Sequence, residues 1–194
     1  AATIGDVDTR IRLDDGNVVV DQLHLQNQKS TLTATGNIQL LTPGTLRPLH
    51  DPTFKFKVGS DHFDPGHFVD VANGNFTFNA ESAGSLEKMA GLVSLTGSQA
   101  NLGGQSIESL SLDAHFDEKR LWVDRIIAAV APDENIEGSG WIGLDKTVDL
   151  QLKSTGIATS NINRVSDYFP GEGNLRVDIS AQGSIENPDI DGRL

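Results

Sequence analysis

The densest group of potential ligand residues is a run of acidic and histidine side chains between positions 61 and 70. Its members follow the pattern D-H-x-D-x-x-H-x-x-D and are Asp61, His62, Asp64, His67 and Asp70. Imidazole nitrogens and carboxylate oxygens are donors that zinc or calcium takes from proteins. The aligned segment in the second half of the chain, 155–164, has no such residues. We therefore favour a polar helix-capping loop over a metal site.

No other set of residues has the spacing of a known catalytic or binding motif. His24, His50 and His115 are isolated, and there is no nucleophile elbow, P-loop or H-E-x-x-H motif. The glycines of 101–104 precede a predicted strand and not a helix, so they predict a turn rather than a phosphate cradle. We assign no catalytic residue, no metal ligand and no cofactor, and we expect that the chain is not an enzyme.

The composition narrows the class of partner. The 194 residues carry a net charge of −12 and have a pI near 4.6, which disfavours binding of nucleic acid or of an anionic membrane by the surface as a whole. The absence of cysteine excludes disulfides and thiolate metal sites. Only 37% of the residues are hydrophobic, and their short alternating stretches are typical of sheets with one apolar face.

The chain lacks the signals of a membrane-spanning helix. Its longest apolar stretch, 126–131, is far shorter than the roughly 18 residues that such a helix needs. It begins at Ala1 without a signal-peptide pattern and stops where its first half would continue. We interpret it as a fragment of a longer repetitive protein whose anchoring or targeting segments lie outside it.

Two segments, 74–93 and 173–194, share one frame of glycines and alternating apolar residues. With an offset of 99, Gly74 aligns with Gly173 and Gly84 with Gly183. Each segment predicts a strand, a glycine break and an extended exit. The apolar positions are Phe76, Phe78 and Ala80 in the first segment and Leu175, Val177 and Ile179 in the second.

The remaining strands of the first half also align with strands of the second half at similar sequence offsets. Offsets of 103 and 104 align the strands that precede them, and an offset of 94 aligns 54–58 with 148–152. The shifts fall in loops, above all in 41–53, where Pro43, Pro48 and Pro52 disfavour regular pairing. We therefore predict two β repeats of about 100 residues, 1–103 and 104–194, stacked in one repetitive architecture.

The alternating pattern predicts eleven strands. A first hairpin closes at Asp14-Asp15-Gly16. The connections 60–73 and 158–172 predict short helical turns from the spacing of their apolar residues. Those residues are Phe63, Phe68 and Val71, and Ile162, Val165 and Phe169. The predicted strands are 4–13, 17–25, 31–40, 54–59, 75–81, 92–100, 107–116, 121–130, 135–144, 148–152 and 174–181.

Polar and acidic residues are expected on the outer face of the sheet. Trp122 has the opposite parity to Leu121, so we expect it outside the core or at an edge, whereas Trp141 is expected to pack in the ordinary way. The acidic residues expected outside are Asp14, Asp15, Asp117, Glu118, Asp145 and Asp149.

The exit of the second repeat carries a family-like motif. Residues 183–194, G-S-I-E-N-P-D-I-D-G-R-L, resemble the G-x-[LI]-x-N-P-x-[LI]-x-G-x-L segment of the AsmA-like superfamily, most of all its TamB (translocation and assembly module) family. The strand 139–144, S-G-W-I-G-L, resembles the family's sGxixL strand, and 162–173 is similar to its link between groove strands. The first repeat departs from the motif at Lys88-Met89, where Asn-Pro is expected.

The resemblance implies a fold, a cellular location and partners. Such proteins are long, are anchored in the inner membrane and span the periplasm with curved antiparallel sheets that form an apolar trough, the β-taco. The resemblance implies transport of phospholipid to the outer membrane, assistance to outer-membrane protein assembly, or both. Through the full-length protein it implies an outer-membrane β-barrel partner, TamA. We therefore expect a periplasmic location, phospholipid as the ligand and no nucleic acid.

The predicted fold is all-β, a curved, groove-like antiparallel sheet built from two stacked repeats with short helical connections. A strand of seven residues is about 23 Å long, comparable to an extended acyl chain. The residues predicted to form a lipid groove are Phe54, Phe56, Val58, Phe76, Phe78, Leu110, Leu112, Phe116, Ile142, Leu144, Leu150, Leu152, Leu175, Val177 and Ile179.

An alternative reading of the same strands is a β-sandwich or solenoid adhesin. Such a protein would close its apolar faces against each other and recognise a protein or glycan through its loops. Phospholipid that co-purifies with the chain would distinguish the trough from the sandwich.

Overall fold

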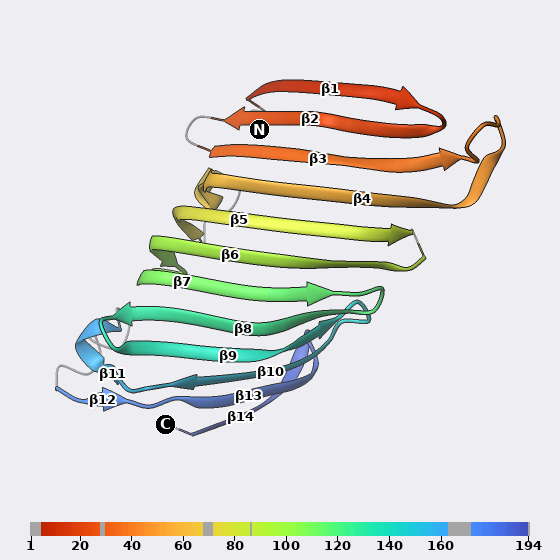
Figure 1. The fold of residues 1–194 in the computed structure, drawn as a ribbon. Coiled ribbons are helices and arrows are strands. Elements are labelled where there is room, and N and C mark those ends of the chain that lie inside the picture. Colours follow the sequence, from red (N-terminus) through yellow and green to blue (C-terminus); the bar gives the residue numbers. More distant parts are fainter. Residues whose placement is uncertain (1–4, 28–29, 68–71, 86, 163–171, 194) are drawn as a thin grey trace.

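The fold is dominated by one large sheet. A computed structural model describes residues 5–27, 30–67, 72–85, 87–162 and 172–193. Twelve strands pair in chain order, each antiparallel to its neighbours (Figure 1). They are β1 (Asp6–Asp14), β2 (Asn17–Asn27), β3 (Ser30–Leu41), β4 (Pro48–Phe63), β5 (Ala72–Ser85), β6 (Met89–Leu102), β7 (Gln105–Phe116), β8 (Arg120–Ala131), β9 (Glu134–Gly143), β10 (Thr147–Ser154), β13 (Asp178–Ser184) and β14 (Asn187–Arg193). The short strands β11 (Ile157–Ala158) and β12 (Asn174–Leu175) form a second, two-stranded sheet.

The large sheet is open, which confirms the predicted all-β, antiparallel, groove-like fold. Its edges are β1 and β14, since each of them pairs with one neighbour in the described part of the chain. In Figure 1 the first strands are seen nearly face-on, whereas β10, β13 and β14 turn away behind β9. The sheet is therefore curved along the direction in which its strands are stacked.

Two β-bulges lie at matching places in the two halves. The register of β2 with β3 shifts between Val20 and Leu23, and that of β8 with β9 shifts between Val123 and Ile126. A bulge adds a residue to one strand, bends that strand and increases its twist. Val20 and Val123 are 103 positions apart, which is the offset that aligns these strands in the sequence.

A cross-strand pair at one end of the strands also recurs. Phe63 pairs with Phe76, and Ile157 pairs with Leu175. The second pair follows the first by the sequence offsets of 94 and 99, so the aligned residues are paired in the same way, although the first pair belongs to the large sheet and the second to the small one. The sheet continues from one half to the other without interruption, because β6 pairs with β7 along its length.

Three details differ from the sequence-based strands. The predicted loop 41–53 is shorter, because β4 begins at Pro48 and includes Pro52; the first residue of a strand is a place where proline is tolerated. Gly84 and Gly183 do not break their strands, since β5 and β13 each continue for one more residue. The predicted strand 174–181 is divided, because 176–177 separates β12 from β13.

Each predicted helical connection contains one turn of 3-10 helix. These turns are η1 (Pro65–His67) and η2 (Thr159–Asn161). The residues Phe68, Val71, Val165 and Phe169, on which the prediction also rested, lie outside the described residues. No helix in the described part of the chain is long and apolar enough to cross a membrane.

The best-buried residues gather at one end of the strands. Ile157 of β11, only 2% exposed, packs there against the ends of β5 to β8. The cluster is formed by Phe76, Ala100, Ile107, Leu110, Val130 and Ile157. We call this end, with η1, η2, β11 and β12 on the left of Figure 1, the capped end. The opposite end, which holds the turns 15–16, 42–47, 87–88, 117–119, 144–146 and 185–186, is the hairpin end.

Candidate functional site

One face of the sheet is apolar along rows of paired residues. Residues that pair directly in antiparallel strands project to the same face. One row crosses β3 to β10 through Gly36, Phe56, Ser82, Gly91, Phe116, Leu121, Ile142 and Val148. The next row crosses the same strands through Ala34, Val58, Ala80, Val93, Ala114, Val123, Gly140 and Leu150. We call the face that these rows share the apolar face.

Most of the predicted groove residues lie on the apolar face. Register and strand alternation place there Phe54, Phe56, Val58, Phe76, Phe78, Leu110, Leu112, Phe116, Ile142, Leu150, Leu152 and Ile179. The other three lie outside the strands of the large sheet. Leu175 pairs with Ile157 in the small sheet. Val177 lies between β12 and β13, where its carbonyl accepts a hydrogen bond from the amide of Ser154 at 2.8 Å. Leu144 lies in the exposed turn between β9 and β10.

Aromatic rings of the apolar face lie over glycines of neighbouring strands. A Cβ atom at Gly97 would be 2.5 Å from two ring atoms of Phe76. A Cβ atom at Gly91 would likewise be 2.5 Å from the ring of Phe116. Rings that cover bare backbone in this way shield it from water. The apolar face is consequently continuous, because no side chain stands between these rings and the next strand.

The apolar face is not covered as a closed core would be. The accessible surface of the chain is 12750 Å², whereas a compact monomer of 20.8 kDa exposes about 8,900 Å². Away from the capped end, residues such as Phe56, Val58, Val93 and Leu150 are only half-buried. Large contiguous apolar surfaces on a protein mark sites for ligands or partners.

The opposite face is polar, as predicted. Lys57 and Glu81 are cross-strand partners there and form an ion pair of 2.6 Å. Asp149 lies on the same polar face, where it pairs with Trp141. The other acidic residues expected outside lie at the hairpin end, in or beside its turns, and are Asp14, Asp15, Asp117, Glu118 and Asp145. None of these six residues lies on the apolar face.

A cluster of aromatic and cationic groups on the polar face is a feature that motif reasoning missed. Trp122 and Trp141 are cross-strand partners with ring centroids 6.3 Å apart. The guanidinium carbon of Arg120 lies 4.0 Å from the Trp141 ring centroid and 5.3 Å from that of Trp122. His115 stacks on Trp122, and its Nδ1 lies 2.9 Å from Oδ2 of Asp124. Trp122 thus lies outside the core as expected, and Trp141 is its partner on the same face.

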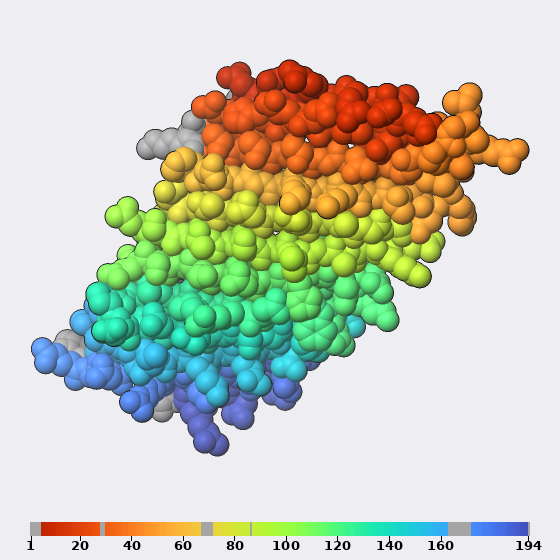
Figure 2. All heavy atoms as spheres, in the orientation of Figure 1, coloured from red at the N-terminus to blue at the C-terminus, as the bar shows by residue number. Residues whose placement is uncertain are grey.

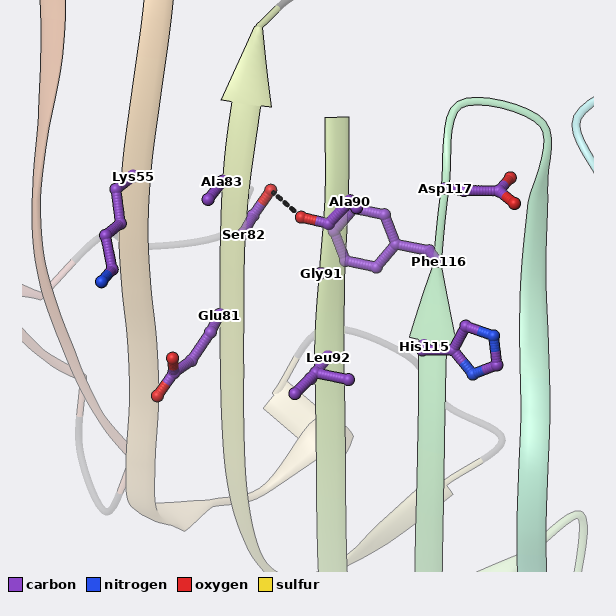
Figure 3. Close-up of a pocket in the computed structure, with 10 residues that line it drawn as sticks. All are labelled: Lys55, Glu81, Ser82, Ala83, Ala90, Gly91, Leu92, His115, Phe116 and Asp117. Carbon is purple, nitrogen blue, oxygen red and sulfur yellow. Dashed lines mark hydrogen bonds between the residues drawn. The ribbon is translucent and has the colours of Figure 1, made fainter. Parts of the chain in front are cut away.

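A shallow depression of about 480 Å³ adjoins this cluster. Ala83, Ala90 and Gly91 lie along it, and Figure 3 shows that Phe116 leans across β6 toward Gly91 while His115 leans the other way. Ligand sites are concave and hold a few convergent polar groups. Here the small residues between larger neighbours account for the hollow, so we do not assign the function to it.

The carboxylate of Asp64 is used by the backbone of its own loop. Its Oδ1 accepts hydrogen bonds from the amides of Gly66 at 3.0 Å and Gly74 at 3.3 Å. His62 Nδ1 lies 3.1 Å from Oδ1 of Asn75. Asp70 lies outside the described residues. Within the described ranges no three histidine or acidic side chains converge as metal ligands would, and Asp64 has the capping role that we favoured.

Two aspartates shape the turns at the hairpin end. The amides of Lys119 and Arg120 donate to Oδ1 of Asp117 at 2.8 Å each, and these bonds lower the pKa of Asp117. The hydroxyl and the amide of Thr147 both donate to Oδ1 of Asp145, which lowers the pKa of Asp145. Both carboxylates therefore stabilise turns, and neither lies on the apolar face.

No family model, curated protein or solved structure matches the chain. Figure 2 shows the strands stacked in chain order from red to blue. The apolar face is the largest feature of this sheet that could bind a ligand.

Proposed function

We propose that the apolar face binds phospholipid acyl chains and that the chain is one segment of a bridge-like protein carrying phospholipid across the periplasm to the outer membrane. The observation that carries this proposal is an apolar face that is continuous over eight strands. Away from the capped end Ala114 and Val148 are buried, whereas Phe56, Val58, Val93 and Leu150 remain half-exposed. The resemblance to the TamB family supplies the remaining parts of the proposal, namely the inner-membrane anchor, the periplasm and the β-barrel partner in outer-membrane protein assembly.

The dimensions and energetics of the apolar face suit an acyl chain. From Leu110 to Phe116 it extends along β7 for six residue steps, or about 20 Å. That length exceeds the roughly 15 Å hydrocarbon thickness of one membrane leaflet. Each methylene that leaves water contributes on the order of 0.8 kcal/mol. Binding of this kind needs no specific polar contact, so it is compatible with a chain in which we found no catalytic motif.

A sandwich adhesin would require a different environment for the apolar residues of these strands. It requires the apolar residues to be closed against a second layer, whereas the exposed area of 12750 Å² is far above that of a compact monomer. An adhesin would also bind through its loops, and a variant of the apolar face would then leave binding intact. The open sheet supports the lipid proposal over this alternative.

Native mass spectrometry of the purified chain tests the proposal. We expect adducts with the masses of phospholipids that are lost after extraction with organic solvent and restored by incubation with phospholipid vesicles. A chain that carries no phospholipid and takes up none from vesicles would overturn the proposal and favour the adhesin.

A further inference from the structure

Strand β1 is an edge of the large sheet, with no strand beyond it in the part of the chain that the structure describes (Figure 1). Every residue of β1 is exposed. Its large apolar side chains are included, with Val7 at 52%, Ile11 at 59% and Leu13 at 72%. The unpaired N–H and C=O groups of a long edge strand can pair with a strand of another chain.

The two faces of β1 differ in chemistry. Its register with β2 places the odd-numbered side chains on the apolar face and the even-numbered ones on the polar face. The extra residue of the bulge, Asp21, belongs to β2, so the alternation along β1 is unbroken. The even-numbered residues are all charged and are, in order, Asp6, Asp8, Arg10, Arg12 and Asp14.

This charge pattern is complementary to itself in one register. Among antiparallel registers that pair at least five residues of each copy and keep apolar side chains opposite apolar ones, one avoids opposing like charges. It sets Asp8 opposite Arg10 of a second copy and Asp6 opposite Arg12, and symmetry repeats each pair. A shift of two residues would set Arg10 opposite Arg10, or Asp8 opposite Asp8. Opposite charges in directly paired positions stabilise a sheet and like charges destabilise it.

The same register also joins the apolar faces. Val7 lies opposite Ile11 of the second copy, and Thr9 lies opposite Thr9 on the two-fold axis. Because this axis is perpendicular to the sheet, the apolar faces of both copies lie on one side. A shift of a single residue would set every apolar side chain opposite a charged one.

The charged groups at the centre of this register have no competing partner. Asp8 and Arg10 form no salt bridge with any residue that the structure describes. Arg12, by contrast, already lies 3.0 Å from Asp14 and 3.2 Å from Asp21. The register therefore depends most on the pair of Asp8 with Arg10.

The other edge of the sheet, β14, is less suited to pairing. With a second β14, each register of the same kind sets Asp189 or Asp191 of one copy opposite an aspartate of the other. Pairing of β1 with β14 can match Asp8 with Arg193 and Arg10 with Asp191. It would also include Pro188, which has no N–H to donate.

We propose that two copies of this chain pair antiparallel through β1, with Asp8 of each copy opposite Arg10 of the other. The pair is closed, because the same edge of both copies is used. It would extend the apolar face across both copies. The proposal goes beyond the proposed function and does not depend on it, since the contact involves no lipid.

Sedimentation velocity of the chain without lipid tests the pairing. We expect a concentration-dependent species of twice the 20.8 kDa mass of the chain. Arg10→Asp and Asp8→Arg each set like charges opposite one another, so each alone should raise the dissociation constant about tenfold or more. An equal mixture of the two variants restores both opposite-charge pairs and should associate as the wild type does. Circular dichroism checks that both variants fold.

A cysteine variant tests the register. Thr9→Cys should form a disulfide-linked dimer under mild oxidation, because the chain has no cysteine of its own and directly opposed residues bring their Cα atoms within disulfide reach. Leu13→Cys is the matched control on the same face of β1. It lies opposite position 5 of the second copy and should form far less linked dimer.

Asp191→Arg is the control for the other edge and should leave association unchanged. A wild-type chain that remains monomeric even at about 1 mM would overturn the proposal. Association that is lost in Asp191→Arg, or that the mixture of Arg10→Asp and Asp8→Arg does not restore, would overturn it in favour of β1 pairing with β14. Equal disulfide formation by Thr9→Cys and Leu13→Cys would contradict the register.

Discussion

The ring of Phe76 on β5 packs against the bare backbone of Gly97 on β6, its cross-strand partner. A Cβ atom at position 97 would approach two ring atoms to 2.5 Å, and Phe76 is 2% exposed within the buried cluster. The ring consequently has no free space into which it can move. We predict that Gly97→Ala lowers the free energy of unfolding by about 1–3 kcal/mol, measured by urea denaturation.

Two further variants separate this clash from a general effect of alanine. Gly173→Ala is the control, because the nearest atom to a Cβ at that position is 3.9 Å away, and it should leave stability nearly unchanged. Phe76→Leu combined with Gly97→Ala should cost less than the sum of the two single changes. A Gly97→Ala chain as stable as the wild type would contradict the packing of Phe76 over Gly97.

The cluster on the polar face offers a spectroscopic prediction. Trp122 and Trp141 are the two tryptophans of the chain, so intrinsic fluorescence reports on this cluster. Arg120→Ala removes the cation over both rings, and we expect an altered tryptophan emission with a loss of stability of about 0.5–1 kcal/mol. Arg125→Ala is the control, since its guanidinium pairs weakly with Glu137 at 3.9 Å. Identical emission spectra for the wild type and Arg120→Ala would refute the cation–π contact.

The turn aspartates predict how stability depends on pH. The pKa of Asp145 is lowered in the folded chain by hydrogen bonds from the Thr147 hydroxyl and amide. A carboxyl of lowered pKa stabilises the fold above its unfolded pKa of about 4, and this contribution is lost as the pH falls through the folded value. The Tm difference between the wild type and Asp145→Ala should therefore be largest near neutral pH and shrink below pH 4 or so.

The hydroxyl of Thr147, which donates to Asp145, offers a second test of how this turn is stabilised. Thr147→Val removes the hydroxyl that donates to Asp145 and should reproduce part of the loss at neutral pH. A Tm difference between the wild type and Asp145→Ala that is the same at pH 7 and at low pH would show that the ionised carboxylate does not stabilise the turn.

The strands and their faces were predictable because alternation is a local property. Phe54, Phe56 and Val58 share one parity of a strand, so any antiparallel partner in register places them on one face. The Asp14-Asp15-Gly16 turn was also predictable, since its chemistry is specific to tight hairpins. Because the sequence pattern repeats after about 100 residues, the strands predicted in one half of the chain also predicted those in the other half.

The features that were not predicted depend on contacts between distant residues. Ile157 is the best-buried large side chain, yet its burial depends on the path that brings β11 to the ends of β5 to β8. Trp141 has the opposite parity to Ile142, which was a signal that it shares the polar face with Trp122. Its contact with Arg120 could not be inferred, because that contact depends on the register between β8 and β9. The start of β4 was missed because Pro48 was treated as a breaker, although a strand can begin with proline.

Leu150 and Gln151 on β10 allow a direct comparison of the two faces of the sheet in acyl-chain binding. Leu150 pairs with Gly140 and Ala181 on the apolar face, whereas Gln151 is exposed on the polar face. Leu150→Asp and Gln151→Asp introduce the same charge one residue apart. The measurement is the transfer of a phospholipid with a fluorescent acyl chain from vesicles to each variant, with circular dichroism to confirm folding.

We expect both variants to remain folded and Gln151→Asp to bind lipid as the wild type does. Leu150→Asp should lose affinity by about tenfold or more, since an unpaired charge would face the acyl chain. Unfolding of Leu150→Asp would instead place Leu150 in a closed core and favour the sandwich. Lipid transfer to a folded Leu150→Asp that equals transfer to Gln151→Asp and to the wild type would contradict the assignment of the apolar face as the binding site.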